Sequence, residues 1–146
     1  MAFRLGRVGN LVLVRWERVE EPDVTAFVDG LRAAQGELGD RRPFVAGIVP
    51  EHAEAPPHRV RQLMAERTVE ALHHTERAFA VLEGSSVRSM LHRLVVTAAF
   101  AFAGHRDRLT VCRSLDDVIG QLGRELHATR SDVHATAARL FRSEGG

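Results

Sequence analysis

The sequence contains no lysine, because all 20 of its basic residues are arginine. This absence excludes a Schiff-base lysine, the lysine of a Walker-type phosphate loop and the lysine of a kinase-type site. Cysteine is nearly absent too. Cys112 is the only one, so no internal disulfide can form, and a reducing compartment is expected.

Long apolar runs are also missing. The longest nearly apolar stretch, 94–104, is far shorter than the ~20 residues that cross a bilayer. The first ten residues have no apolar core of signal-peptide length. We therefore expect a cytoplasmic protein without a transmembrane segment.

The charges are almost balanced. Twenty basic and 19 acidic residues give a net charge of +1, whereas nucleic-acid-binding domains usually show a strongly basic face. No nucleic-acid partner is therefore expected. With 146 residues, 45% of them hydrophobic, the chain is long enough to bury one core without disulfides or a metal.

The apolar patterns predict a single mixed α/β domain. Two short apolar runs, 3–8 and 11–16, are joined by Gly9-Asn10, which is typical of a β-hairpin. Further expected strands are 42–50, 78–84 and 109–114; expected helices are 22–36, 57–76, 86–103 and 115–128. Because strands and helices alternate, we expect a sheet with an N-terminal hairpin followed by parallel β-α units with right-handed crossovers.

A C-terminal extra helix is expected after this domain. In 131–146, Val133, Ala137, Leu140 and Phe141 share a face, and Ser131 is a candidate cap. We treat 1–128 as the domain and 129–146 as a helical extension. Within the domain, Ser114 and Asp117 form a capping-box-like pattern that opens the helix at 115.

Several segments together resemble the STAS domains (sulfate transporter and anti-sigma factor antagonist). They are a hairpin ending in LVLVRW, the strand FVAGIVP, a Pro-Pro loop before a helix, AFAVLEGSSVRSMLHR and LTVCRSLDDVIGQL. The resemblance covers residues 3 to about 126 and is with the bacterial branch similar to the sporulation anti-anti-sigma factor. It implies a STAS-like, non-enzymatic signalling module that acts through protein–protein interaction.

The phosphorylation switch of that family has no counterpart here. In its signalling members a kinase modifies a Ser or Thr at the start of the helix that follows the central strand. The matching stretch, 50–61, contains neither residue, and the first hydroxyl in the helix is Thr68. The resemblance therefore implies a regulatory or scaffolding module without this switch.

The loop and first turn at 51–61 are the predicted partner-binding surface, because strand-to-helix junctions often carry the function of α/β domains. The residues concerned are Glu51, His52, Glu54, His58, Arg59 and Arg61. Four possible metal ligands lie here, but a solvated polar loop is favoured because no second ligand cluster is obvious. Glu54 and His58 could form an acid–base pair only if they were buried. We expect no enzyme activity, no metal and no cofactor.

Two further places are candidates for contacts. Ser85 and Ser86 follow Gly84 at a strand-to-helix turn, where they either contact an anion or ligand or simply cap the helix. The helix 86–103 is apolar nearly all round in its second half, so it is buried or meets a partner. The possible interface consists of Val96, Phe100, Phe102, Leu140 and Phe141.

That greasy surface leaves three occupants open: a second copy in a homo-oligomer, the C-terminal helix or a lipid chain. The leading hypothesis is the STAS-like regulatory or scaffolding module, with an unidentified protein partner. The alternative is a small-molecule or lipid carrier of similar fold, since CRAL-TRIO lipid-transfer proteins resemble this architecture. An enzyme centred on Glu54 and His58 is the third reading.

Overall fold

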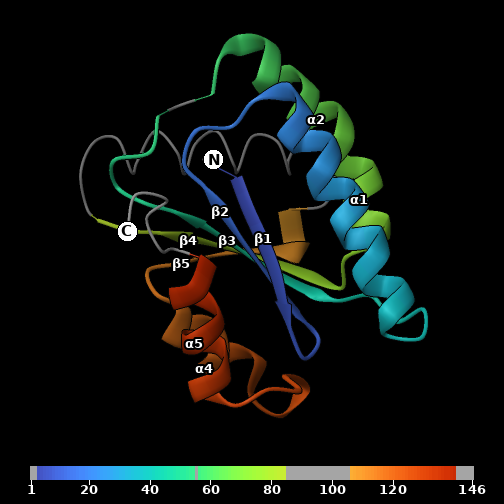
Figure 1. Ribbon diagram of the computed structural model, residues 1–146, viewed down its shortest axis with the longest axis vertical. Helices are drawn as coiled ribbons and strands as arrows, with labels where there is room; N and C mark the ends of the chain where they lie inside the picture. Colours follow the sequence, from blue (N-terminus) through green and yellow to red (C-terminus); the bar gives the residue numbers. More distant parts are fainter. Residues whose placement is uncertain (1–2, 55, 85–105, 141–146) are drawn as a thin grey trace.

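The structure, a computed structural model, describes residues 3–54, 56–84 and 106–140 (Figure 1). These residues form one five-stranded sheet whose strands lie side by side in sequence order. The strands are β1 (Phe3–Val8), β2 (Leu11–Trp16), β3 (Phe44–Val49), β4 (Arg77–Leu82) and β5 (Leu109–Cys112). β1 and β2 pair antiparallel and all other neighbours pair parallel. The predicted hairpin with parallel β-α units is thus confirmed.

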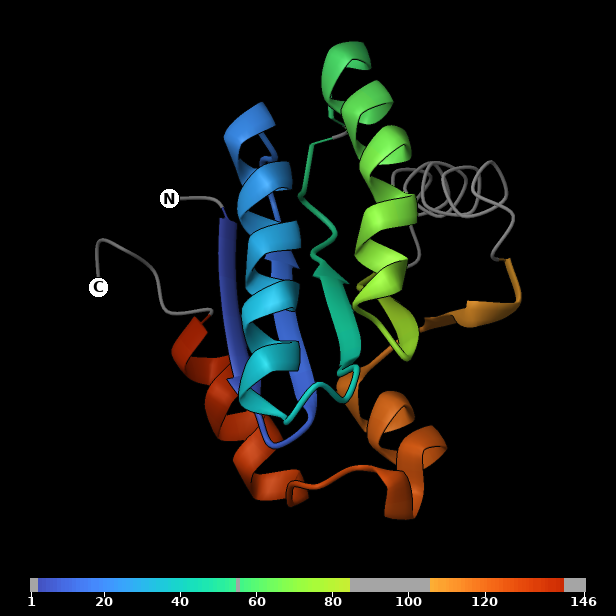
Figure 2. The same ribbon diagram turned by 90° about the vertical axis from the view of Figure 1, so that its right-hand side faces the viewer.

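Helices cover both faces of this sheet (Figures 1 and 2). One face carries α1 (Glu21–Glu37) and α2 (His58–His73), and the other carries α4 (Leu115–Leu122) and α5 (Arg130–Leu140). Successive residues of a strand point to opposite faces. In β2, Leu11 therefore packs in the core of α4 and α5, whereas Val12 packs in the core of α1 and α2. Burial on both faces explains why β2, β3 and β4 are largely apolar along their length.

The hairpin turn is tied to the C-terminal part of the chain. Gly9 has φ +60°, and a Cβ atom there would lie 2.1 Å from the carbonyl oxygen of His127. The Asn10 side chain donates to the carbonyl oxygen of Glu125 (2.8 Å) and accepts from the N–H of His127 (2.7 Å). The sequence indicated the turn but not these long-range contacts.

Helix α2 ends earlier than predicted, at His73 instead of residue 76. The N–H of Glu76 donates to the carbonyl oxygen of Pro43 (2.8 Å), which draws the chain into β4. Arg108 donates to the carbonyl oxygens of Leu72, in the last turn of α2, and Thr75, just after the helix. The Leu72 carbonyl oxygen also accepts the N–H of Thr75 (3.3 Å).

The helix predicted over 115–128 is also shorter. It stops at Leu122 because Gly123 has φ +52°, and a short 3-10 turn, η2 (Gly123–Glu125), follows. At its start Ser114 accepts from the N–H of Asp117 (3.2 Å), as predicted. The Asp117 carboxylate, however, accepts a hydrogen bond from the N–H of Arg113. A regular capping box would require the N–H of Ser114 instead.

The cap of α5 was predicted wrongly. Thr129, not Ser131, accepts from the N–H of Asp132 (3.1 Å), so the helix begins at Arg130, two residues earlier than a cap at Ser131 implies. Val133 and Ala137 pack into the core formed with α4, and Leu140 lies against Gly6 of β1. The other four members of the predicted apolar interface lie outside the described residues: Val96, Phe100, Phe102 and Phe141. The same holds for Ser85, Ser86 and the predicted helix 86–103.

Candidate functional site

The predicted partner-binding residues gather at the carboxyl edge of the parallel strands. Glu51, His52 and Glu54 are exposed in the loop after β3. Glu51 lies beside Gly84, the second residue after β4, where an added Cβ would come within 2.4 Å of the Glu51 carboxyl carbon. The loops that follow two neighbouring strands therefore meet here.

This loop is held to the end of β2 by ion pairs. His52 contacts Glu17 (Nε2 to Oε1, 2.5 Å) and Glu54 contacts Arg18 (3.6 Å). The pKa of Glu17 is lowered, first by the hydrogen bond with His52 and then by the charges of Arg15, His52 and Arg18, while partial burial acts in the opposite direction. The network therefore joins the loop after β2 to the loop after β3 at the protein surface.

The remaining predicted residues stand in the first turn of α2. Arg59 donates to Glu21 of α1 (3.2 Å), which joins the two helices. His58 and Arg61 are exposed, and neither has a hydrogen-bond or ion-pair partner within the described ranges. Glu54 pairs with Arg18, so the acid–base pair of Glu54 and His58 considered from the sequence is not formed.

No metal centre is formed in the described part of the chain. Within 3–54, 56–84 and 106–140, no three His, Cys, Asp or Glu side chains come close enough together to hold an ion. Cys112 is buried beneath α4, and burial raises the pKa of its thiol, as does the nearby Asp117 carboxylate. A protonated, buried thiol is a poor nucleophile.

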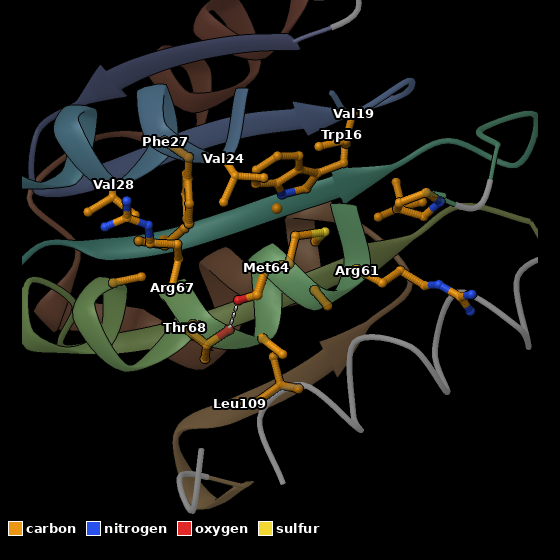
Figure 3. A pocket seen from close by; sticks show the side chains of 18 of the residues that line it. Trp16, Val19, Val24, Phe27, Val28, Arg61, Met64, Arg67, Thr68 and Leu109 are labelled. Atoms are coloured by element: carbon orange, nitrogen blue, oxygen red, sulfur yellow. Dashed lines mark hydrogen bonds between the residues drawn. The ribbon is translucent and has the colours of Figure 1, made fainter. Parts of the chain in front are cut away.

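A cavity of about 540 Å³ lies between the sheet and helices α1 and α2 (Figure 3). The sequence analysis did not foresee it. Three small residues on the sheet make the room: Gly47 in β3 and Ala78 and Ala80 in β4. They alternate with larger side chains that point to the opposite face, such as Ile48 and Phe79.

One end of the cavity is walled by aromatic rings. Trp16 lies over Gly47, where an added Cβ would come within 2.9 Å of the indole nitrogen. Phe27 of α1 meets Trp16 edge to face, with ring centroids 5.0 Å apart. Opposite them, Met64 and Thr68 face the cavity from α2 (Figure 3). Gly47 therefore leaves the room that the indole of Trp16 occupies over β3.

The cavity interior offers little polar chemistry. Two hydroxyls line it among the described residues, Thr68 and Thr75. Each donates to a backbone carbonyl one turn back in α2, that of Met64 (2.6 Å) and that of Ala71 (2.7 Å). The charged residues that line the cavity are all exposed at its rim: Glu54, His58, Arg61 and Arg67. Such a space suits an apolar group.

Comparisons with protein-family models, curated proteins and solved structures were made for the whole chain. None of them finds a match. The STAS resemblance therefore remains a prediction, and the α/β fold rests on the structure itself. None of the helices in the described ranges is long and apolar enough to span a membrane.

Proposed function

We propose that this protein is a non-enzymatic binding module that holds a small apolar ligand in the cavity between the sheet and helices α1 and α2. The observation that carries the proposal is the cavity itself. Its volume of about 540 Å³ falls within the range of about 300–1,000 Å³ that is usual for small-molecule sites. This function corresponds to the ligand carrier that the sequence left as an alternative.

A binding role is favoured over catalysis by the chemistry of the lining. The interior hydroxyls of Thr68 and Thr75 are engaged with the backbone. The titratable lining residues stand at the rim, where Glu54 and His58 do not pair. General acid–base catalysis needs a positioned pair within hydrogen-bond reach of a bound substrate. The lining instead supports a site that sequesters an apolar molecule.

The STAS-like regulatory or scaffolding role is the second candidate. It is favoured by the exposed charged side chains that gather at the carboxyl edge, among them Glu51, Glu54, His58 and Arg61. In this role a protein partner would bind this edge, and a ligand in the adjacent cavity would change that binding. The cytoplasmic location, the partner and a homo-oligomer remain predictions.

Native mass spectrometry of the full chain, purified from cells without organic solvent, tests the leading proposal. We expect an added mass that disappears after extraction with organic solvent, because an apolar guest should survive purification only inside the protein. The variant Ala80→Leu, which fills the cavity floor, should carry less of it. Ala138→Leu is the matched control on the exposed side of α5 and should carry as much as the unchanged protein. Equal masses before and after extraction, with no uptake of added dodecanol, would contradict the proposal.

A further inference from the structure

The rim of the cavity indicates what kind of ligand the interior would accept. We infer that the ligand is an amphipathic anion: an apolar chain or ring that bears one acidic group such as a carboxylate. Its apolar part would lie between α1, α2 and the sheet, and its acidic group would lie at His58 and Arg61. This inference rests on the function proposed above and adds the ligand class to it.

The first step concerns the interior. A polar group taken from water into an apolar space costs free energy unless it finds a hydrogen-bond partner. The hydroxyls of Thr68 and Thr75 already donate to carbonyl groups of α2. The polar end of a ligand must therefore remain at the rim, where charged side chains and water are within reach.

The second step is the charge balance of that rim. Most of its ions are already paired: Glu54 with Arg18, Arg59 with Glu21, and Arg67 with Glu70 at 2.8 Å. The adjoining loop contributes a further pair, His52 with Glu17.

Two cation-forming side chains remain after this pairing, His58 and Arg61. Neither has a hydrogen-bond or ion-pair partner in the described parts of the chain, and both line the cavity. The first turn of α2 contains no acidic side chain. Among the lining residues the charge left after pairing is therefore positive, which complements an anionic group. The exposed carboxylate of Glu51 belongs to the adjoining loop and does not line the cavity.

The third step is their position. His58 and Arg61 are three residues apart, so they share one side of α2 near its start. Figure 3 shows Arg61 extending from α2 away from the apolar interior formed by Trp16 and Met64. The acidic group would then be solvent-exposed while the chain behind it is enclosed. Because the contact is exposed, it adds selectivity for an anion more than it adds affinity.

Calorimetry with two probes of equal chain length tests the inference. Dodecanoate and dodecanol, both kept below the concentrations at which they aggregate, differ in the acidic group. For the full chain at pH 8 and low salt we expect dodecanoate to bind about tenfold more tightly. Arg61→Gln should weaken dodecanoate binding by about fivefold and leave dodecanol binding within twofold. His58→Gln tests the second side chain in the same way at pH 6, because an imidazole attracts an anion only when it is protonated.

The control is Arg124→Gln, which removes another exposed arginine on the opposite side of the sheet and should change neither affinity. If both probes bind equally and Arg61→Gln alters neither, the anion inference is overturned while the proposed function stands. If neither probe binds to the unchanged protein, the proposed function is overturned as well. Thermal melting of each variant confirms that it is folded.

Discussion

Two buried alanines on neighbouring strands provide a direct test of whether the cavity is empty space. Ala80 in β4 lines the cavity, and Ala46 in β3 is fully buried in the core beneath α4 and α5. The same substitution, Ala→Leu, adds the same three carbon atoms at both positions. Strand propensity changes equally at both, so a difference in the free energy of unfolding reports on the surroundings.

The expected magnitudes follow from burial and packing. Each buried carbon contributes about 0.8 kcal/mol, so Ala80→Leu could gain up to about 2.4 kcal/mol if the cavity receives the side chain. Loss of rotamer freedom removes about 0.5–1 kcal/mol of that gain. Ala46→Leu has no cavity to enter, and overpacking should cost about 1–3 kcal/mol. We therefore expect opposite signs for the two variants.

Urea unfolding at 25 °C, followed by circular dichroism, measures both changes. Ala80→Leu should raise the unfolding midpoint or leave it unchanged, and Ala46→Leu should lower it, with similar slopes for both. The lateral neighbours of Ala80 are Gly47 and Val111, so β3 itself places no side chain beside the added one. Trp16, which lies over Gly47, bounds the space on that side. If Ala80→Leu lost as much stability as Ala46→Leu, the space would be filled in solution and the reasoning would be refuted.

Three further perturbations test other parts of the structure. The lowered pKa of Glu17 means that its pairing stabilises the fold above the ordinary value of 4.5, and that this contribution is lost as the pH falls through the lower, folded-state value. Glu17→Gln should therefore flatten the acid side of a curve of unfolding free energy against pH. The change should not exceed about 0.5 kcal/mol, because the side chain is 36% exposed to solvent. Asn10→Ala removes both contacts to Glu125 and His127 and should cost about 1–2 kcal/mol in chemical unfolding, whereas an unchanged midpoint would show that the contacts are not stabilising. Deleting 131–146 removes the buried part of α5 and should lower the melting temperature or change the oligomeric mass; a variant with both unchanged would contradict the packing described.

Local patterns were sufficient for most of the fold. Gly9-Asn10 between two apolar runs predicted the hairpin, and the continuous apolar run at 42–50 predicted a strand buried on both faces. Helix ends were predicted less well, because several signals compete there. Thr129 and Ser131 are both good caps, and the choice between them depends on how the preceding turn is anchored.

The cavity was beyond the reach of local patterns. It exists because the register sets Gly47 of β3 beside Ala80 of β4, and because Trp16 lies across that glycine. Small residues in a strand have no special meaning until the neighbouring strand and the covering helix are known. The absence of a partner for His58 and Arg61 in the described parts of the chain likewise could not be predicted, because it depends on which ion pairs the other charged residues form. The small residues on one face of two adjacent strands are a sequence signal for the cavity, but this signal can be recognised only once the strand order is known.

The hydrogen bonds between Asn10 and the turn after α4 have a consequence for synthesis of the chain. Asn10 and Glu125 are separated by 115 residues. At about 5–20 residues per second, a ribosome needs about 6–23 s to bridge that interval. During this time the first hairpin has left the exit tunnel, yet the α4–α5 layer that shields Leu11 and Leu13 has not been made. The nascent chain therefore exposes apolar side chains on one face of the sheet, and binding of a chaperone at this stage would protect them from aggregation.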